Sequence, residues 1–305
     1  MSVTLVTRDP FPGGSFPLAG RLTSRVGYGM GQVTRHAGNS EAQAKAVELL
    51  HVAFDLGITH FDTAQFYGDG LANELLRASF GNRRKDILIA TKAEAKPVPG
   101  APIPLEAAQK PFELRAAVEA NLRTLGTNWI DVVNLRRMDF TPGLLAGGEQ
   151  VVPFEDQLAE MAALRDEGKI LGIGLSHVTV EQLRTAMPVG ISCVQTSTTW
   201  STVPKSRCSS SASRTTSRGF RTPPRWWLGT LPKVIDQDRV QVVAFRLGVT
   251  ASQVGLAWQH THSPNTMLIP GTSSIEHLKE NTAAGKIRLD KTAMSALDTA
   301  AADHI

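Results

Sequence analysis

Short apolar segments alternate with longer segments of helical periodicity along most of this chain. We expect strands at residues 25–30, 57–62, 86–91, 129–135, 170–176, 191–195 and 267–269, and helices at residues 39–56, 71–80, 111–125, 154–167, 180–186, 238–247, 250–259, 274–284 and 291–300. The residues up to about Gly20 are rich in Pro and Gly and suit a hairpin that caps one end of a domain. Mostly apolar strands that alternate with helices predict a parallel sheet covered on its outside by helices.

The alternation breaks at residues 197–237, an atypical basic segment rich in Ser and Arg. This segment follows neither hydrophobic period, so we expect loop or disorder there, and an eighth strand would have to lie inside it. Between residues 201 and 235 there are seven Lys and Arg residues and no acidic residue. Such an abrupt composition favours a shifted reading frame in GC-rich DNA, and a genuine basic lid is the alternative.

Composition narrows the class of protein. A chain of 305 residues with 42% hydrophobic content can bury the core of one large α/β domain or of two small ones. Two cysteines make neither a disulfide framework nor a metal cluster, and no signal peptide or membrane span is evident, so we expect a cytoplasmic protein without a metal site. The sequence pI of about 9.2 reflects the atypical segment, whose pattern argues against nucleic-acid binding.

Candidate chemistry begins where the strand at residues 57–62 ends. Asp62 lies at its C-terminal end, and Tyr67, one of two tyrosines beside Tyr28, follows five residues later. In an α/β barrel that end of the strands carries the active site, although Asp and Gly are also ordinary turn residues. His60 points into the same interior, where we interpret it as a core histidine.

Five different sequence motifs follow one another along the chain. They are Phe61-Asp62-Thr63-Ala64 with Tyr67-Gly68, Ala90-Thr91-Lys92, residues 131–136, residues 172–176, and residues 269–281. Their order and spacing resemble the aldo-keto reductase family. The resemblance implies one (β/α)8 TIM barrel over residues 1–305, with an N-terminal hairpin cap and extra C-terminal helices. It also implies NADPH as cofactor and a small-molecule carbonyl substrate, with no nucleic-acid, membrane or obligate protein partner.

The resemblance implies four catalytic residues, Asp62, Tyr67, Lys92 and Arg136. Tyr67 would protonate the carbonyl oxygen, and the charge of Lys92, held by Asp62, would lower the phenol pKa. Arg136 stands where the family usually has His; a guanidinium can polarise a carbonyl but cannot shuttle protons. The alternative is a structural ion pair of Arg136, for which Asp139 is a candidate partner.

The resemblance also implies cofactor-binding residues. They are Gly29, Met30, Asp62, Ser176, His177, Gln195, Ile269, Pro270, Gly271, Thr272, Ser274, His277, Glu280 and Asn281. Ser176, His177 and Gln195 match positions that hold the nicotinamide carboxamide, with His177 in place of the usual Asn. The segment from Ile269 onward matches the site of the adenosine 2′-phosphate, at a helix N-terminus suited to phosphate. The alternative is a capped helix with Ser273 and Glu276 three residues apart, and both interpretations can hold together.

The sequence therefore predicts an NADPH-dependent oxidoreductase that reduces an aldehyde or ketone, with Tyr67 as proton donor. One alternative is a barrel that binds NADP(H) as a regulatory or redox-sensing subunit with little turnover. Another is a chain made inactive by residues 197–237, with no cover over the cofactor.

Overall fold

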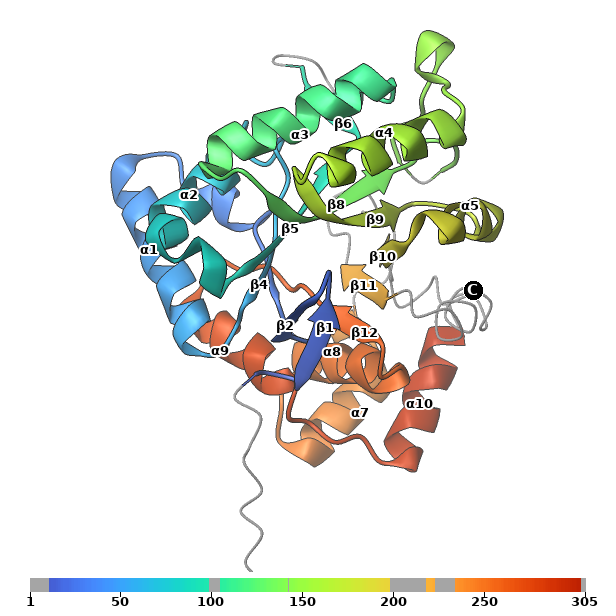
Figure 1. Ribbon diagram of the computed structural model, residues 1–305. Coiled ribbons are helices and arrows are strands. Elements are labelled where there is room, and N and C mark those ends of the chain that lie inside the picture. Colours follow the sequence, from blue (N-terminus) through green and yellow to red (C-terminus); the bar gives the residue numbers. More distant parts are fainter. Residues whose placement is uncertain (1–10, 99–104, 142, 198–217, 223–233, 303–305) are drawn as a thin grey trace, which may run out of the picture.

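The computed structural model describes residues 11–98, 105–141, 143–197, 218–222 and 234–302. Its centre is an eight-stranded sheet in which every pairing is parallel, in the order β12, β11, β10, β9, β8, β5, β4, β3 (Figure 1). The strands are β3 (Tyr28–Gly29), β4 (His60–Asp62), β5 (Leu88–Ala93), β8 (Ile130–Arg136), β9 (Ile170–Ser176), β10 (Ile191–Ser197), β11 (Arg218–Thr222) and β12 (Thr266–Leu268). The predicted parallel sheet is confirmed.

The two ends of this strand order lie next to each other. Val26 forms a parallel bridge with Leu268, and the Gly27 amide donates to the Leu268 carbonyl across 2.7 Å. One step further, the Gly29 amide donates to the Pro270 carbonyl across 3.2 Å. The sheet therefore curls until the segments of β3 and β12 meet, which is the TIM-like arrangement that the family resemblance implies.

Helices cover the outside of the curled sheet (Figure 1). They are α1 (Ser40–Asp55), α2 (Leu71–Phe80), α3 (Pro111–Leu125), α4 (Phe154–Asp166), α5 (Val180–Ala186), α7 (Asp238–Leu247), α8 (Ala251–His262), α9 (Ile275–Ala284) and α10 (Lys291–Ala302). The apolar faces of α1 to α5, with Leu278 of α9, pack on outward residues of the strands such as Ile89 and Val133, whereas α7, α8 and α10 pack on one another in a separate cluster. The inward residues, among them Leu88 and Val132, form a second cluster inside the sheet. This in-and-out alternation follows from the two-residue repeat of a strand.

An antiparallel hairpin of β1 (Ser15–Leu18) and β2 (Arg21–Ser24) caps the N-terminal ends of the strands, as predicted. Arg21 donates to the carboxylate of Asp131 across 2.6 Å and to the carbonyl of Ile87 across 2.9 Å. Asp131 belongs to β8 and is fully enclosed, so this ion pair fastens the cap to the sheet. The hairpin leaves the opposite, C-terminal ends of the strands uncovered by this cap, and the candidate active site lies there.

One difference from the sequence analysis lies between β5 and α3, where no strand is expected. There β6 (Ala95–Pro97) pairs antiparallel with β7 (Leu105–Ala107). The eighth strand lies inside the atypical segment, as the sequence analysis requires, and is β11 between β10 and β12. Residues 198–217 and 223–233 of that segment fall outside the described residues, and so do the predictions made for them.

Within the described part of the chain, no single helix is long and apolar enough to cross a membrane. Helices α7 and α8 pass that test only as a pair, and they are bent by 93° relative to each other.

Candidate active site

Alternation along the strands points a set of polar side chains inward at one end of the sheet. On β5 the inward residues Leu88 and Ala90 belong to the inner cluster, so Lys92 and the following Glu94 continue the same face. On β8 the same repeat runs from Val132 through Asn134 to Arg136. Because parallel strands end at the same edge, these residues and those that end β4 and β10 meet there.

Asp62 is the centre of the hydrogen bonds at this edge. Lys92 Nζ donates to Asp62 Oδ1 across 2.7 Å and to the Thr63 carbonyl across 3.0 Å. Gln195 Nε2 donates to the other carboxylate oxygen, Asp62 Oδ2, across 2.9 Å. Burial raises the pKa of Asp62, while the Lys92 ammonium opposes that shift; the same carboxylate raises the pKa of Lys92, which stays charged. The structure thus brings together Asp62 and Lys92, as the sequence predicts.

The Tyr67 ring lies beside this pair. Lys92 Nζ is 5.0 Å from the centre of the ring, and a Cβ added at Gly31 would lie 3.4 Å from Tyr67 Cζ, so the backbone of Gly31 lines the phenol. The charge of Lys92 acts on the phenol pKa in the predicted direction, but burial has the larger effect. Burial raises the pKa of Tyr67 above its usual value, and the charge of Lys92 only reduces that rise. Tyr67 is therefore held in its protonated form.

Arg136 ends β8 with a side chain that is 25% exposed. Its Nη1 lies 3.8 Å from Oε1 of Glu94, and it is Arg137 that pairs with Asp139, through contacts of 2.7 and 2.8 Å. Arg136 therefore does have an ion-pair partner, as the alternative expects, but the partner is Glu94 and not Asp139. Adjacent residues of a strand point to opposite faces, and only Arg136 shares the inward face of Asn134.

Glu94 is the site residue that the sequence analysis missed. Its side chain is only 4% exposed, and burial raises the pKa of its carboxyl, against the opposing charges of Arg136 and Lys92. The signal was present in the strand repeat, since Glu94 follows Lys92 by two residues. The predicted strand ends at Thr91, whereas β5 extends to Ala93, so the prediction places Glu94 in a loop.

The candidate carboxamide residues lie at the ends of β9 and β10. Ser176 and Gln195 are buried, and Gln195 Oε1 has no hydrogen-bond partner among the described residues. His177 has a positive φ of 52°, a conformation in which Asn is common and which His also adopts. Its Nε2 lies 2.8 Å from the Phe140 carbonyl and its ring stacks on Phe140, so that nitrogen is already engaged.

The first and last strands approach each other closely at Gly29 and Gly271, two of the candidate cofactor-binding residues. A Cβ on Gly29 would lie 2.7 Å from the Ile269 carbonyl oxygen, and one on Gly271 would lie 2.5 Å from the Gly29 carbonyl oxygen. Only glycine permits this approach of two backbones. The side chain of Met30 is enclosed in the core, and its amide donates to the Asp62 carbonyl across 2.8 Å. Met30 therefore contributes backbone alone to this edge.

Helix α9 begins directly after this approach. Ser274 is its N-cap and accepts from the His277 amide across 3.3 Å, so the proposed cap at Ser273 with Glu276 is wrong by one residue. The Thr272 hydroxyl is bound by the Ser274 amide across 3.1 Å, and its carbonyl accepts from the Tyr28 hydroxyl. The remaining predicted residues are placed along the same stretch: Pro270 buried before the helix, His277 exposed, and Glu280 and Asn281 half-buried one turn on.

These residues fit a nicotinamide dinucleotide. The unused Gln195 Oε1 is an acceptor for a carboxamide. At the N-terminus of α9 the hydroxyls of Thr272 and Ser274 each accept one bond and can still donate to a phosphate. The engaged Nε2 of His177 is the one poor match. Among the described residues no group of three His, Cys, Asp or Glu side chains is arranged to hold a metal ion.

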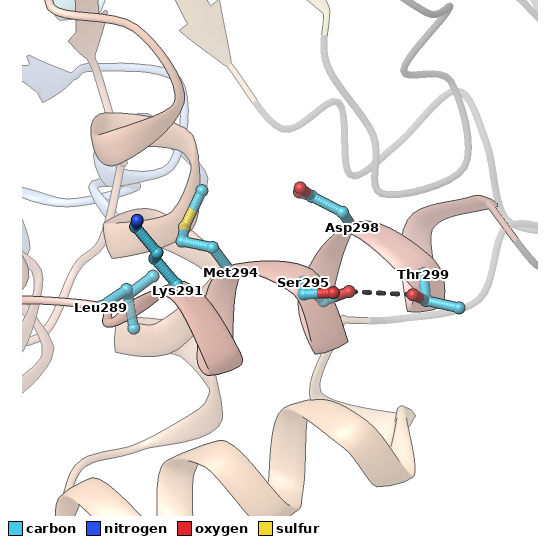
Figure 2. A pocket seen from close by; sticks show the side chains of 6 residues that line it. All are labelled: Leu289, Lys291, Met294, Ser295, Asp298 and Thr299. Atoms are coloured by element: carbon cyan, nitrogen blue, oxygen red, sulfur yellow. Dashed lines mark hydrogen bonds between the residues drawn. The ribbon is translucent and has the colours of Figure 1, made fainter.

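A surface hollow elsewhere does not compete with this site. Figure 2 shows the six residues that line it, namely Leu289, Lys291, Met294, Ser295, Asp298 and Thr299. All belong to α10 or the turn before it. Asp298 Oδ1 accepts a hydrogen bond from Trp258 Nε1 across 2.8 Å, and the Thr299 hydroxyl donates to the Ser295 carbonyl. The hollow therefore presents one helix face without convergent reactive groups.

The sequence profile of the Aldo/keto reductase family matches residues 25–215 and 204–302. The chain belongs to this family. It is 34% identical over 287 residues to pyridoxine 4-dehydrogenase of Escherichia coli, which covers 93% of this chain and 97% of that protein. It is 29% identical over 295 residues to an uncharacterised oxidoreductase of Schizosaccharomyces pombe, covering 95% of this chain and 90% of the relative.

Solved structures agree on the fold. An aldo-keto reductase from Klebsiella pneumoniae in complex with NADPH superposes with a TM-score of 0.72 at 22% identity, covering 91% of each chain. A glycerol dehydrogenase from Gluconobacter oxydans superposes with a TM-score of 0.77 at 18% identity, covering 96% of each chain.

Proposed function

We propose that this protein is an NADPH-dependent oxidoreductase that reduces an aldehyde or ketone to an alcohol, with Tyr67 as the proton donor. We also propose that the curled sheet is a closed (β/α)8 barrel within one domain, with its active site at the C-terminal ends of the strands. The membership of the aldo/keto reductase family supports the reaction class.

One observation supports the assignment above all others: the buried Asp62–Lys92 pair beside a phenol. Two enclosed, oppositely charged side chains 2.7 Å apart are costly to bury, and such groups cluster at active sites. The phenol of Tyr67 is the neighbouring group that can carry a transferable proton near neutral pH, since Lys92 is tied to the carboxylate. The arrangement therefore matches general-acid chemistry.

Each residue of the site has its own role in the proposed reaction. The raised pKa of Tyr67 keeps a proton on the phenol, and Lys92 stabilises the tyrosinate that remains once the substrate oxygen has taken that proton. Asp62 keeps Lys92 charged and in place through the bond of 2.7 Å. Arg136 offers N–H donors to the carbonyl oxygen.

Gln195 and Ser176 would hold the nicotinamide carboxamide, and Thr272, Ser274 and His277 would hold the adenosine phosphate. NADPH, when bound, supplies the hydride for the carbonyl carbon. The close backbones at Gly29 and Gly271 leave no side chain between the strands and the ribose.

The substrate class is narrowed by similarity. Because the E. coli relative is a pyridoxine 4-dehydrogenase, an aromatic aldehyde of the pyridoxal type belongs first in any substrate panel. The alternative of a regulatory barrel without turnover has no comparable support, since the matched family and this relative are enzymes by name.

The test follows NADPH oxidation spectrophotometrically with a panel of aldehydes that includes pyridoxal. We expect Tyr67→Phe to lower kcat by about 100-fold or more, because the phenol proton is lost. Tyr28→Phe removes the same hydroxyl from the core, where it bonds to the Thr272 carbonyl, and is expected to change the KM for NADPH and the Tm more than kcat. Equal rates for wild type and Tyr67→Phe would reject Tyr67 as the proton donor.

A further inference from the structure

Glu94 is a buried carboxylate for which the proposed reaction has no role. Its Oε1 lies 3.8 Å from Arg136 Nη1, and its Oε2 has no hydrogen-bond partner among the described residues. A carboxylate that is enclosed and only loosely paired is costly for a folded protein. Such groups are common where a charge is needed for the chemistry of a site.

The position of Glu94 relative to Arg136 is set by the protein core. Gln109 Nε2 donates to the backbone carbonyls of both residues, across 2.9 Å to Glu94 and 3.2 Å to Arg136. Gln109 is itself enclosed, and its own carbonyl accepts from Gln157 Nε2 across 2.6 Å. One amide therefore ties the ends of β5 and β8 together, so that the approach of the two charges is a built feature of the site.

The charged and titratable groups that face Glu94 come from four places. They are Asp62 on β4, Tyr67 in the loop after it, Lys92 on β5 and Arg136 on β8. Asp62 is matched with Lys92 at 2.7 Å, which leaves Glu94 as the carboxylate opposite Arg136. At 3.8 Å this contact is too long for a hydrogen bond, so Glu94 acts on its neighbours through its charge.

The positive charge of Arg136 suggests a role for the carboxylate of Glu94. Arg136 stands at the position where the family resemblance leads one to expect a histidine, so the site carries a permanent cation in place of a titrating ring. An unbalanced second cation near Lys92 would favour tyrosinate, and a phenol that has already lost its proton cannot donate one. A carboxylate fixed beside the guanidinium cancels that charge.

We propose that Glu94 is a positioning residue that balances the charge of Arg136 and thereby keeps the Tyr67 phenol protonated for the reaction. The proposal rests on the proposed function only in taking the protonated phenol as the reactive form. Its electrostatic content is a property of the protein alone, so it can be measured without cofactor or substrate.

Absorbance titration of tyrosine is the direct test, because the chain has only two tyrosines. Burial raises the pKa of both tyrosines, so the titration is made in a Tyr28→Phe background, where Tyr67 is the one tyrosine of the chain and every tyrosinate reports it. We expect Glu94→Gln to lower the midpoint of that titration by roughly 1 pH unit. Glu94→Asp, which keeps the charge, should return it most of the way to the wild-type value.

The matched control is Glu149→Gln. Glu149 pairs with Lys110 across 2.6 Å but is 88% exposed, so the same chemical change there should leave the midpoint where it was. Near-ultraviolet circular dichroism over the same pH range confirms that each variant is folded during the titration. An unchanged or higher midpoint in folded Glu94→Gln would overturn the proposal, and if that variant does not fold, a Glu94→Asp midpoint lowered by as much as a full unit would do so.

Steady-state kinetics with NADPH and an aldehyde provide the second readout. In Glu94→Gln the decline of kcat at high pH should begin roughly 1 pH unit lower than in wild type, with little change in the KM for the carbonyl. A shifted titration midpoint with no turnover of any carbonyl would support the role of Glu94 and contradict the proposed function. A wild-type midpoint in Glu94→Gln together with normal turnover would contradict the role of Glu94 and support the proposed function.

Discussion

Lys92 donates a hydrogen bond to Asp62 across 2.7 Å, and both side chains are almost completely enclosed. The contact joins the ends of two neighbouring strands, β4 and β5, whose register places Asp62 opposite Ala90, two residues before Lys92. Because Lys92 also donates to the Thr63 carbonyl, the ammonium holds the start of the loop that leads to Tyr67. Stability and chemistry are therefore linked at this one pair.

Replacing Lys92 with methionine tests that link. The change leaves Asp62 buried without its cation, so we expect the free energy of unfolding to fall by about 3 kcal/mol and kcat by about 100-fold or more. Urea unfolding and NADPH oxidation measure the two effects. Lys45→Met is the control, since Lys45 pairs with Glu41 at the same 2.7 Å but is 72% exposed, and should cost less than about 0.5 kcal/mol. An equal loss of stability in both variants would contradict the assigned importance of burial.

The N-cap of α9 tests the cofactor site. Ser274→Ala removes the hydroxyl that accepts from the His277 amide, so we expect a loss of about 1 kcal/mol of stability and roughly tenfold weaker NADPH binding. Fluorescence titration with NADPH and thermal unfolding provide the measurements. Asn39→Ala removes a comparable cap from α1, where Asn39 accepts from the Ala42 amide across 2.9 Å. It should cost similar stability and leave NADPH binding unchanged; weakening in both variants would show a general effect of stability.

Acid should destabilise the fold through His260. This ring is buried, its Nε2 lies 3.1 Å from the Gly13 carbonyl, and burial together with the charge of Arg25 lowers its pKa to about 4. The unfolded chain, with a His pKa near 6.5, binds this proton first as the pH falls. The stabilising effect of the neutral ring is thus complete above about pH 6.5 and is lost progressively down to about pH 4.

Urea unfolding at pH 7 and pH 5 measures this dependence. Between these two values His260 should contribute about 2 kcal/mol of lost stability. His260→Gln should reduce the pH dependence by that amount, because glutamine does not titrate. If the variant and the wild type lose the same free energy between the two pH values, His260 is not the group responsible.

Local pattern was sufficient for much of the fold. The apolar strands and periodic helices are found within a few residues of the predicted ranges, because strand and helix periods are properties of neighbouring residues. The position of Lys92 relative to Asp62 was also predictable, since both end adjacent strands of one parallel sheet. The short hairpin of β6 and β7 was not, because it interrupts a Pro-rich stretch with no strand pattern.

What the sequence by itself determined, then, is which side chains stand at the C-terminal edge of the sheet. Only the tertiary structure decided which of them meet. It paired Asp139 with Arg137, placed Glu94 opposite Arg136 and buried Tyr67 partly, so that burial outweighs the charge of Lys92 in setting the phenol pKa. The physical reason is that pairing distances and desolvation depend on residues brought together from distant strands, and a pattern along one strand does not contain them.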